Sequence, residues 1–135
     1  MTRAHGIDLS HWDGKFDPTK ATGQIDFAIM KASEGTVRDP AFDEIWGGVQ
    51  QIPIRGAYHY LRSSWGWEAQ ASAFLQAVRG RDFHFYALDF EGTGNEMEPR
   101  FASMAHTWIE YIAAATGVKV LLYTNPSHYD ADLFP

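Results

Sequence analysis

The sequence of 135 residues contains no cysteine. Without thiols, the chain has neither a disulfide framework nor a thiolate nucleophile, and this absence leaves its compartment open. It also lacks any run approaching the ~20 consecutive apolar residues of a membrane-spanning helix. The N-terminal segment "MTRAHGIDLS" has no apolar stretch of the kind found in signal peptides. We therefore expect no membrane association and no signal peptide.

Positive charge is scarce, because 11 Lys and Arg residues face 17 Asp and Glu residues, for a formal net charge of −6. A mildly acidic surface does not favour binding to nucleic acid or to anionic membranes. No linker, low-complexity segment or block of charge divides the chain. With 45% hydrophobic residues, the sequence predicts one globular domain over residues 1–135.

Apolar runs of strand length alternate with stretches of helical periodicity. The expected strands cover residues 5–10, 27–33, 54–61, 85–91 and 118–124, and the expected helices cover 40–51, 65–78 and 98–116. Asp39, directly before Pro40, is the expected N-cap of the first helix. Strands that alternate with helices indicate βα units. The sequence therefore predicts an α/β fold with a parallel sheet and helices packed outside it.

Polar and aromatic side chains end these apolar runs. They are Asp8 and Ser10, Lys31 and Glu34, Tyr58, His59 and Tyr60, Asp89 and Glu91, and Tyr123 and Asn125. In parallel sheets and barrels, ligands bind beyond the C-terminal ends of the strands. The candidate functional residues are therefore these side chains.

Asp89 and Glu91 are the most informative pair, because residues at i and i+2 of a strand face the same side. Two crowded carboxylates raise the pKa of at least one of them, which places a proton donor beside an anion, as glycosidic cleavage requires. Structural roles compete with this interpretation. The pair could cap the next helix, Asp8 could be a helix cap, Lys31 could be a structural counter-ion, and Tyr58, Tyr60 and Tyr123 could be packing residues.

The histidines do not suggest a metal site. His5, His59, His84, His106 and His128 form no H-x-H or H-E-x-x-H pair. We therefore expect neither a metal nor another cofactor.

Five motifs occur in an order that resembles the Chalaropsis-type lysozymes of glycoside hydrolase family 25, which cleave peptidoglycan at N-acetylmuramic acid. They are "GIDLSHWDGKFD", "FAIMKASEGTVRDPAF", "IRGAYHYL", "YALDFEG" and "VLLYTNP". The resemblance covers nearly the whole chain, but the family continues into three further strands. It implies an incomplete TIM-like (β/α) barrel of about five βα units, with residues 1–135 as a C-terminally truncated catalytic domain.

The resemblance also implies roles for the strand-end residues. Glu91 would be the general acid, Asp89 its anionic partner, and Asp8 a supporting group in the same mouth. The implied substrate-binding residues are Tyr58, Tyr60 and Tyr123, with Lys31 and Glu34 tuning the electrostatic field. The implied partner is the peptidoglycan glycan strand. The protein would stay in the cytoplasm until release, as a phage endolysin does, or be secreted by another route, and act on the cell wall.

Two other functions remain open at the level of sequence. One is a cell-wall glycan-binding module that keeps the groove without turnover. The other is a metal-dependent polysaccharide deacetylase or phosphoesterase with ligands drawn from His5, Asp8, His59 or Asp89.

The length of the chain gives a further expectation. At about 30 residues per βα unit, 135 residues cannot close an eight-stranded barrel. The strands at 5–10 and 118–124 would then be open edges, so we expect homo-oligomers that complete the barrel. Activity would be highest on the acidic side of neutrality, with a bell-shaped pH profile.

Overall fold

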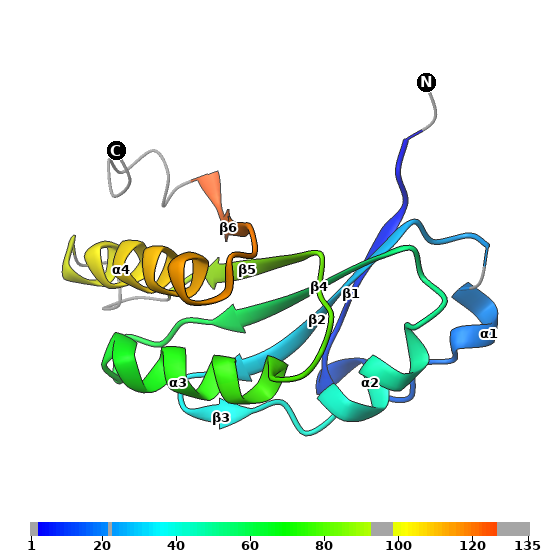
Figure 1. Ribbon diagram of the computed structural model, residues 1–135, viewed down its shortest axis with the longest axis horizontal. Coiled ribbons are helices and arrows are strands. Elements are labelled where there is room, and N and C mark those ends of the chain that lie inside the picture. Colours follow the sequence, from blue (N-terminus) through cyan, green and yellow to red (C-terminus); the bar gives the residue numbers. More distant parts are fainter. Residues whose placement is uncertain (1–2, 22, 93–98, 127–135) are drawn as a thin grey trace.

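The computed structural model describes residues 3–21, 23–92 and 99–126. Its centre is one sheet with the strand order β1-β2-β4-β5-β6, in which all neighbours are parallel (Figure 1). The strands are β1 (Gly6–Leu9), β2 (Phe27–Glu34), β4 (Ile54–Tyr60), β5 (Phe85–Phe90) and β6 (Val120–Thr124). All five expected strands are therefore confirmed, and so is the α/β fold class.

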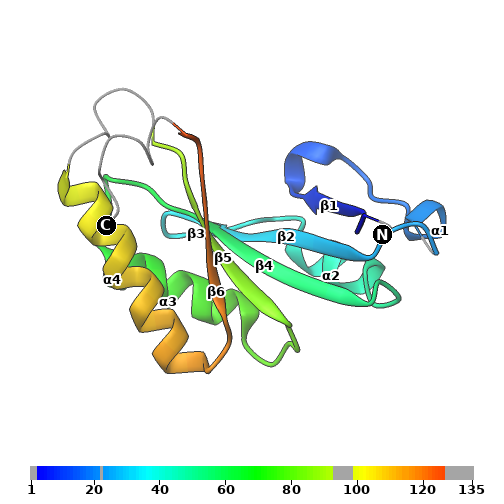
Figure 2. The same cartoon turned by 90° about the horizontal axis from the view of Figure 1, so that it is seen from above.

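The helices cover one face of this sheet. They are α2 (Phe42–Gly48), α3 (Trp67–Val78) and α4 (Pro99–Thr116), and each falls within or close to a predicted range. In Figures 1 and 2, α3 and α4 pack side by side against the sheet, and α2 lies further along the same face. No helix in the described part of the chain is long and apolar enough to cross a membrane.

Three short elements were not predicted, namely η1 (His11–Asp13), α1 (Pro18–Ala21) and β3 (Val37–Arg38), which pairs antiparallel with β2. Each is too short to show a periodicity. The predicted cap was wrong, because the N-cap of α2 is Ala41 and not Asp39. Asp39 lies two residues earlier, where its carboxylate accepts a hydrogen bond of 2.9 Å from the Ala41 N–H.

Side chains alternate between the two faces of the sheet. On the helix side, Met30, Leu88 and Phe90 are fully buried in the core. Trp108 of α4 is also fully buried, and its ring stacks on His59 with a centroid distance of 5.2 Å. The opposite face is open to solvent at its edge, where Tyr123 is 59% exposed. Because side chains alternate along each strand, burial of the apolar residues against the helices places the residues between them on the opposite face of the sheet.

His59 is the centre of a buried polar chain that the sequence did not indicate. Its Nδ1 lies 2.7 Å from Ser33 Oγ, and its Nε2 lies 2.9 Å from Gln70 Oε1. The Gln70 amide is oriented by its Nε2, which donates to the carbonyls of Arg62 and Trp65 at 2.7 and 3.0 Å. Gln70 Oε1 must then accept from His59, so the His59 proton is on Nε2 and Ser33 donates to Nδ1.

Burial lowers the pKa of His59 to about 4, so the ring is neutral at physiological pH. Both ring nitrogens are engaged inside the core, which removes His59 from any ligand set. The metal-dependent alternative therefore loses one of its four candidate ligands.

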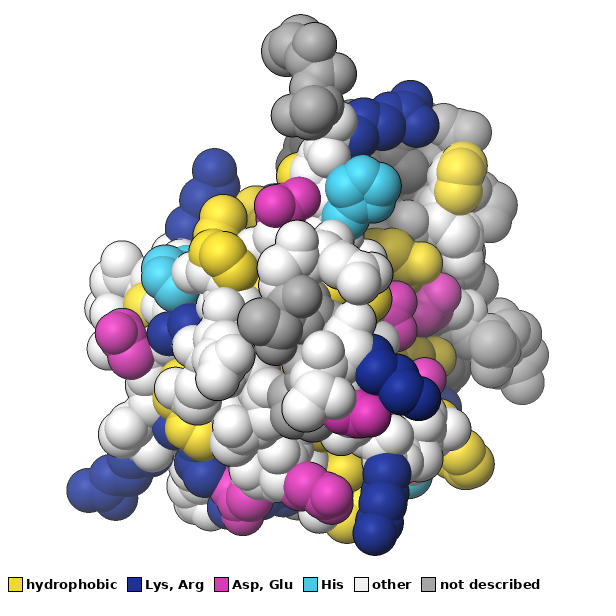
Figure 3. Space-filling model, turned by 90° about the vertical axis from the view of Figure 1, so that its right-hand side faces the viewer, with side chains coloured by type: hydrophobic (Ala, Val, Ile, Leu, Met, Phe, Trp, Pro, Cys, Tyr) yellow, Lys and Arg dark blue, Asp and Glu magenta, His cyan; other side chains and the backbone are white. Residues whose placement is uncertain are grey.

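The sheet is open in the described residues, with β1 and β6 at its two edges. Figure 3 shows the end of the molecule that carries α1 and α2, where acidic and basic side chains are interspersed and do not gather by sign.

Candidate active site

A pocket of about 330 Å³ opens on the face of the sheet that the helices leave uncovered. Its lining includes five of the predicted site residues, Asp8, Tyr58, Asp89, Glu91 and Tyr123, with Ile29 and Ala87 between them. These residues come from five different strands or the loops that follow them. The structure thus brings all five of these side chains together in one pocket.

The strand register explains this convergence. Asp8 of β1 lies opposite Ile29 of β2, and Asp89 of β5 lies opposite Tyr123 of β6. Tyr58 of β4 lies opposite Ala87, two residues before Asp89. Because alternation puts each of these positions on the same face, the pocket follows directly from the parallel pairing.

Asp89 is electrostatically the most perturbed group of the pocket. Burial, its hydrogen bond with Glu91 and the Glu91 charge together raise the pKa of Asp89 to about 8, against a smaller opposing effect of Lys31. Its Oδ1 is buried without a hydrogen-bond partner. Burial and the nearby carboxylates of Asp89 and Asp8 also raise the pKa of Tyr58, which stays a neutral donor. The pair therefore retains one proton at neutral pH.

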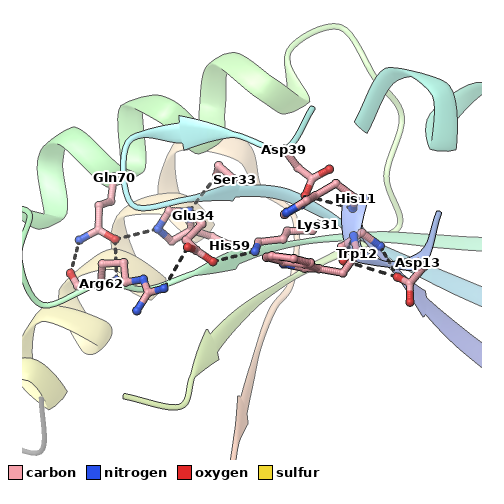
Figure 4. Close-up of polar contacts among 11 residues, drawn as sticks. His11, Trp12, Asp13, Lys31, Ser33, Glu34, Asp39, His59, Arg62 and Gln70 are labelled. Carbon is pink, nitrogen blue, oxygen red and sulfur yellow. Dashed lines mark hydrogen bonds and ion pairs between the residues drawn. The ribbon is translucent and has the colours of Figure 1, made fainter. Parts of the chain in front are cut away.

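Lys31, Glu34 and Tyr60 do not line this pocket. Lys31 is only 5% exposed, and its Nζ lies 2.7 Å from Glu34 Oε1. The other oxygen of Glu34 lies 3.0 Å from Arg62 (Figure 4). The Tyr60 ring lies 5.5 Å from Lys31 Nζ and 4.9 Å from the Arg62 guanidinium. Burial alone would raise the pKa of Glu34, but its bonds to Lys31 and Arg62 outweigh this and lower it.

These three residues form a cluster beside the pocket. Lys31 and Glu34 line a second pocket of about 370 Å³. Lys31 still lowers the pKa of Asp89 through its charge, which agrees with a role in tuning the field.

Sequence reasoning missed Arg62, His11 and the actual position of Asp39. His11 Nδ1 lies 2.6 Å from Asp39 Oδ2, and the Asp39 side chain is completely buried. This contact joins the turn after β1 to the segment after β3 across 28 positions, so no local pattern reveals it. One local signal was available, because Ser10 and Asp13 form a capping box around η1.

Among the described residues, no three His, Asp or Glu side chains form a cluster that could hold a metal ion. His128 lies outside the described residues.

The described residues thus form an open parallel sheet with helices on one face and a pair of carboxyl groups at the strand ends, which defines the chain as an α/β protein. The chain belongs to the glycosyl hydrolases family 25, whose model matches residues 7–134. It is 32% identical over 138 residues to the uncharacterized protein YegX of Escherichia coli K12, in a match that covers 96% of this chain. The chain spans about half the length of the curated relatives it matches (51%).

Solved structures of this family show the same fold. The family 25 glycosyl hydrolase of Bacillus anthracis is 26% identical with a TM-score of 0.87, over 98% of this chain and 67% of the other. The lysozyme of Streptomyces coelicolor is 26% identical with a TM-score of 0.77, over 97% and 67%. The catalytic domain of endolysin ply40 from Listeria phage P40 has a TM-score of 0.83 at 22% identity, over 96% and 67%. The chain therefore has the fold of the N-terminal part of a family 25 lysozyme.

Proposed function

We propose that this protein is a muramidase that hydrolyses the β-1,4 bond between N-acetylmuramic acid and N-acetylglucosamine in peptidoglycan. The observation that carries the proposal is the pocket with two hydrogen-bonded carboxyl groups, Asp89 and Glu91, that share a proton at neutral pH. Family membership and the similarity to a Streptomyces lysozyme support it. The protein would act on the cell wall once it is released from the cytoplasm or secreted.

The proposed mechanism uses the two carboxyl groups in different roles. In this mechanism the pair holds one proton before the substrate binds, and the hydrogen bond between Asp89 and Glu91 would pass that proton to Glu91. Glu91 then protonates the leaving glycosidic oxygen as the bond to the anomeric carbon breaks. Asp89 is left as an anion that stabilises positive charge at the sugar, with Lys31 nearby. Water supplies the new hydroxyl group, and its proton returns to the pair.

The other pocket residues would orient the sugar. The hydroxyl group of Tyr58 remains a proton donor, because its pKa is raised by burial and by the adjacent carboxylates. Tyr123 presents an exposed ring at the edge of the pocket, where it can pack against a sugar face. Asp8 would hold a sugar hydroxyl group from the opposite side.

The rate of hydrolysis should depend on pH as a bell-shaped curve. Because the pKa of Asp89 is raised to about 8, the pair loses its last proton only there, and activity should fall as the pH rises through about 8. At low pH the pair gains a second proton and loses its anion, so activity should fall again. Initial rates of release of reducing ends between pH 3 and pH 10 measure both limbs. A rate that still rises at pH 9 in folded protein contradicts the shared proton.

Clearing of purified peptidoglycan with release of new reducing ends tests the function itself. Binding of muropeptides without new reducing ends would instead identify a glycan-binding module.

We also propose that the chain self-associates through the open edges of its sheet. Within the described residues β6 is an edge strand, and its Leu121 and Tyr123 are exposed. A sheet edge with exposed apolar side chains tends to pair with another chain. Light scattering coupled to size exclusion should give a mass above that of one chain at micromolar concentration. A monodisperse monomer would refute the proposal, and replacement of Leu121 by lysine should shift the equilibrium toward the monomer.

A further inference from the structure

The proposed bond cleavage takes place in the pocket of Asp89 and Glu91. The second pocket, of about 370 Å³, has so far been given no ligand. It is lined by the turn after β2, by β3 and by the loop after β4. Lys31 lines it, while the β4 residue opposite Lys31 in the sheet, Tyr58, lines the catalytic pocket. A substrate that is bound in one pocket can therefore extend into the other across neighbouring strand ends.

The charges of the second pocket favour an anion. Three cations, Lys31, Arg38 and Arg62, and two carboxylates, Glu34 and Asp39, line the pocket. Arg38 also pairs with Asp43, a carboxylate that it shares with Arg81, so the cations still outnumber the carboxylates by one. Both carboxylates are matched internally, since Glu34 pairs with Lys31 and Arg62, and Asp39 accepts from His11 and from the Ala41 N–H.

The two guanidinium groups are accessible to a ligand. The Arg38 and Arg62 side chains are 44% and 39% exposed. A guanidinium carries five N–H donors in a planar fork that suits a carboxylate, so one internal ion pair leaves it able to bind a second anion.

The apolar wall of this pocket is fixed in place. Trp65 is half exposed, and its indole Cδ1 lies only 3.0 Å from the place where a Cβ at position 35 would be. Gly35 has a φ of +55°, so both its conformation and the close indole require glycine. The Trp65 carbonyl is also held by the buried Gln70 amide. A rigid indole beside exposed guanidinium groups suits a peptide that carries carboxylates.

We propose that the second pocket binds the acidic peptide stem attached to muramic acid, an inference that rests on the proposed muramidase function. Peptidoglycan joins an N-acetylated sugar chain to a peptide with free carboxylates, and the two pockets match these two chemistries. A glycan strand without its peptides carries only the single lactyl carboxylate of each muramic acid, whereas the peptide adds further carboxylates at a distance from the sugar that can reach the exposed guanidinium groups. The stem would therefore be recognised beside the bond that is cut.

The probe for this site is N-acetyl-L-alanyl-D-glutamate, which carries two carboxylates. Its binding is followed by the indole N–H resonance of Trp65, assigned with a Trp65→Phe variant. We expect a saturable shift of that resonance, and about ten-fold weaker binding of the corresponding diamide, because the charged hydrogen bonds are lost. Arg62→Gln and Arg38→Gln should each weaken binding of the dipeptide by a similar factor. Arg79→Gln, at an exposed arginine after α3, should leave it unchanged.

Equal binding of the dipeptide and the diamide would overturn the proposal, as would no shift of Trp65. A shift of Trp65 by triacetylchitotriose in place of the dipeptide would assign the pocket to the glycan and refute the peptide site. The binding measurement does not depend on turnover. If peptidoglycan is cleaved and the dipeptide does not bind, only the stem proposal fails; if the dipeptide binds and no reducing ends appear, the muramidase proposal fails.

Discussion

Replacing Glu91 with glutamine should lower the rate of peptidoglycan cleavage by about 10²–10⁴, the usual contribution of a positioned proton donor. Glutamine keeps the size and the hydrogen-bonding capacity of the side chain but cannot give a proton to the leaving oxygen. Since Glu91 lies just after β5 in the pocket and outside the core, the fold should not change. The release of reducing ends gives the rate, and circular dichroism reports the fold.

Glu44→Gln is the matched control, because Glu44 is an exposed acid on α2, away from the pocket. It should clear peptidoglycan at the original rate. If the Glu91 variant also keeps near-original activity while folded, Glu91 is not the acid. In that case Asp89, which holds the raised pKa, becomes the candidate, and Asp89→Asn should show the loss instead.

The second large effect concerns stability in acid. His59 has a pKa of about 4 in the folded protein, against 6.5 for an ordinary histidine. Between these two values the unfolded chain binds a proton that the folded chain does not, so the free energy of unfolding falls as the pH drops from about 6.5 to about 4. The loss from this one group amounts to about 3 kcal/mol. Below about pH 4 the folded protein also takes up the proton, and this contribution to the pH dependence ends.

The measurement is urea unfolding of the original protein and of His59→Gln at several pH values. Glutamine does not titrate. The free energy of unfolding of the original protein minus that of His59→Gln should therefore fall by about 3 kcal/mol as the pH drops from about 6.5 to about 4. A constant difference for His59→Gln would show that the folded and unfolded chains take up the His59 proton equally, and would contradict the lowered pKa.

The fold was predictable because hydrophobic burial repeats along the chain. Runs such as residues 27–33 and 85–91 carry enough β-branched, aromatic and apolar residues to be read locally, and the confirmed strands follow them closely. The convergence of Asp8, Asp89 and Tyr123 followed from one rule, that parallel strands place their C-terminal ends together.

The features that sequence reasoning missed are contacts between distant positions. Arg62 reaches Glu34 across 28 residues, and His11 reaches Asp39 across the same separation, so neither leaves a periodic trace. The location of the shared proton also depends on three-dimensional burial. Spacing alone predicted that at least one carboxyl of the pair would have a raised pKa, and only the packed environment places that shift on Asp89.

The order of the strands in the sheet has a consequence for how the protein is made. Apart from the short β3, each strand pairs with the next one along the chain, from β1 to β6. As the polypeptide leaves the ribosome, every new strand therefore meets a partner that has already been synthesised, which favours folding from one edge of the sheet to the other. Asp89 and Glu91 emerge before Tyr123. A nascent chain that has not yet reached β6 thus carries both carboxylates but lacks the wall that completes their pocket.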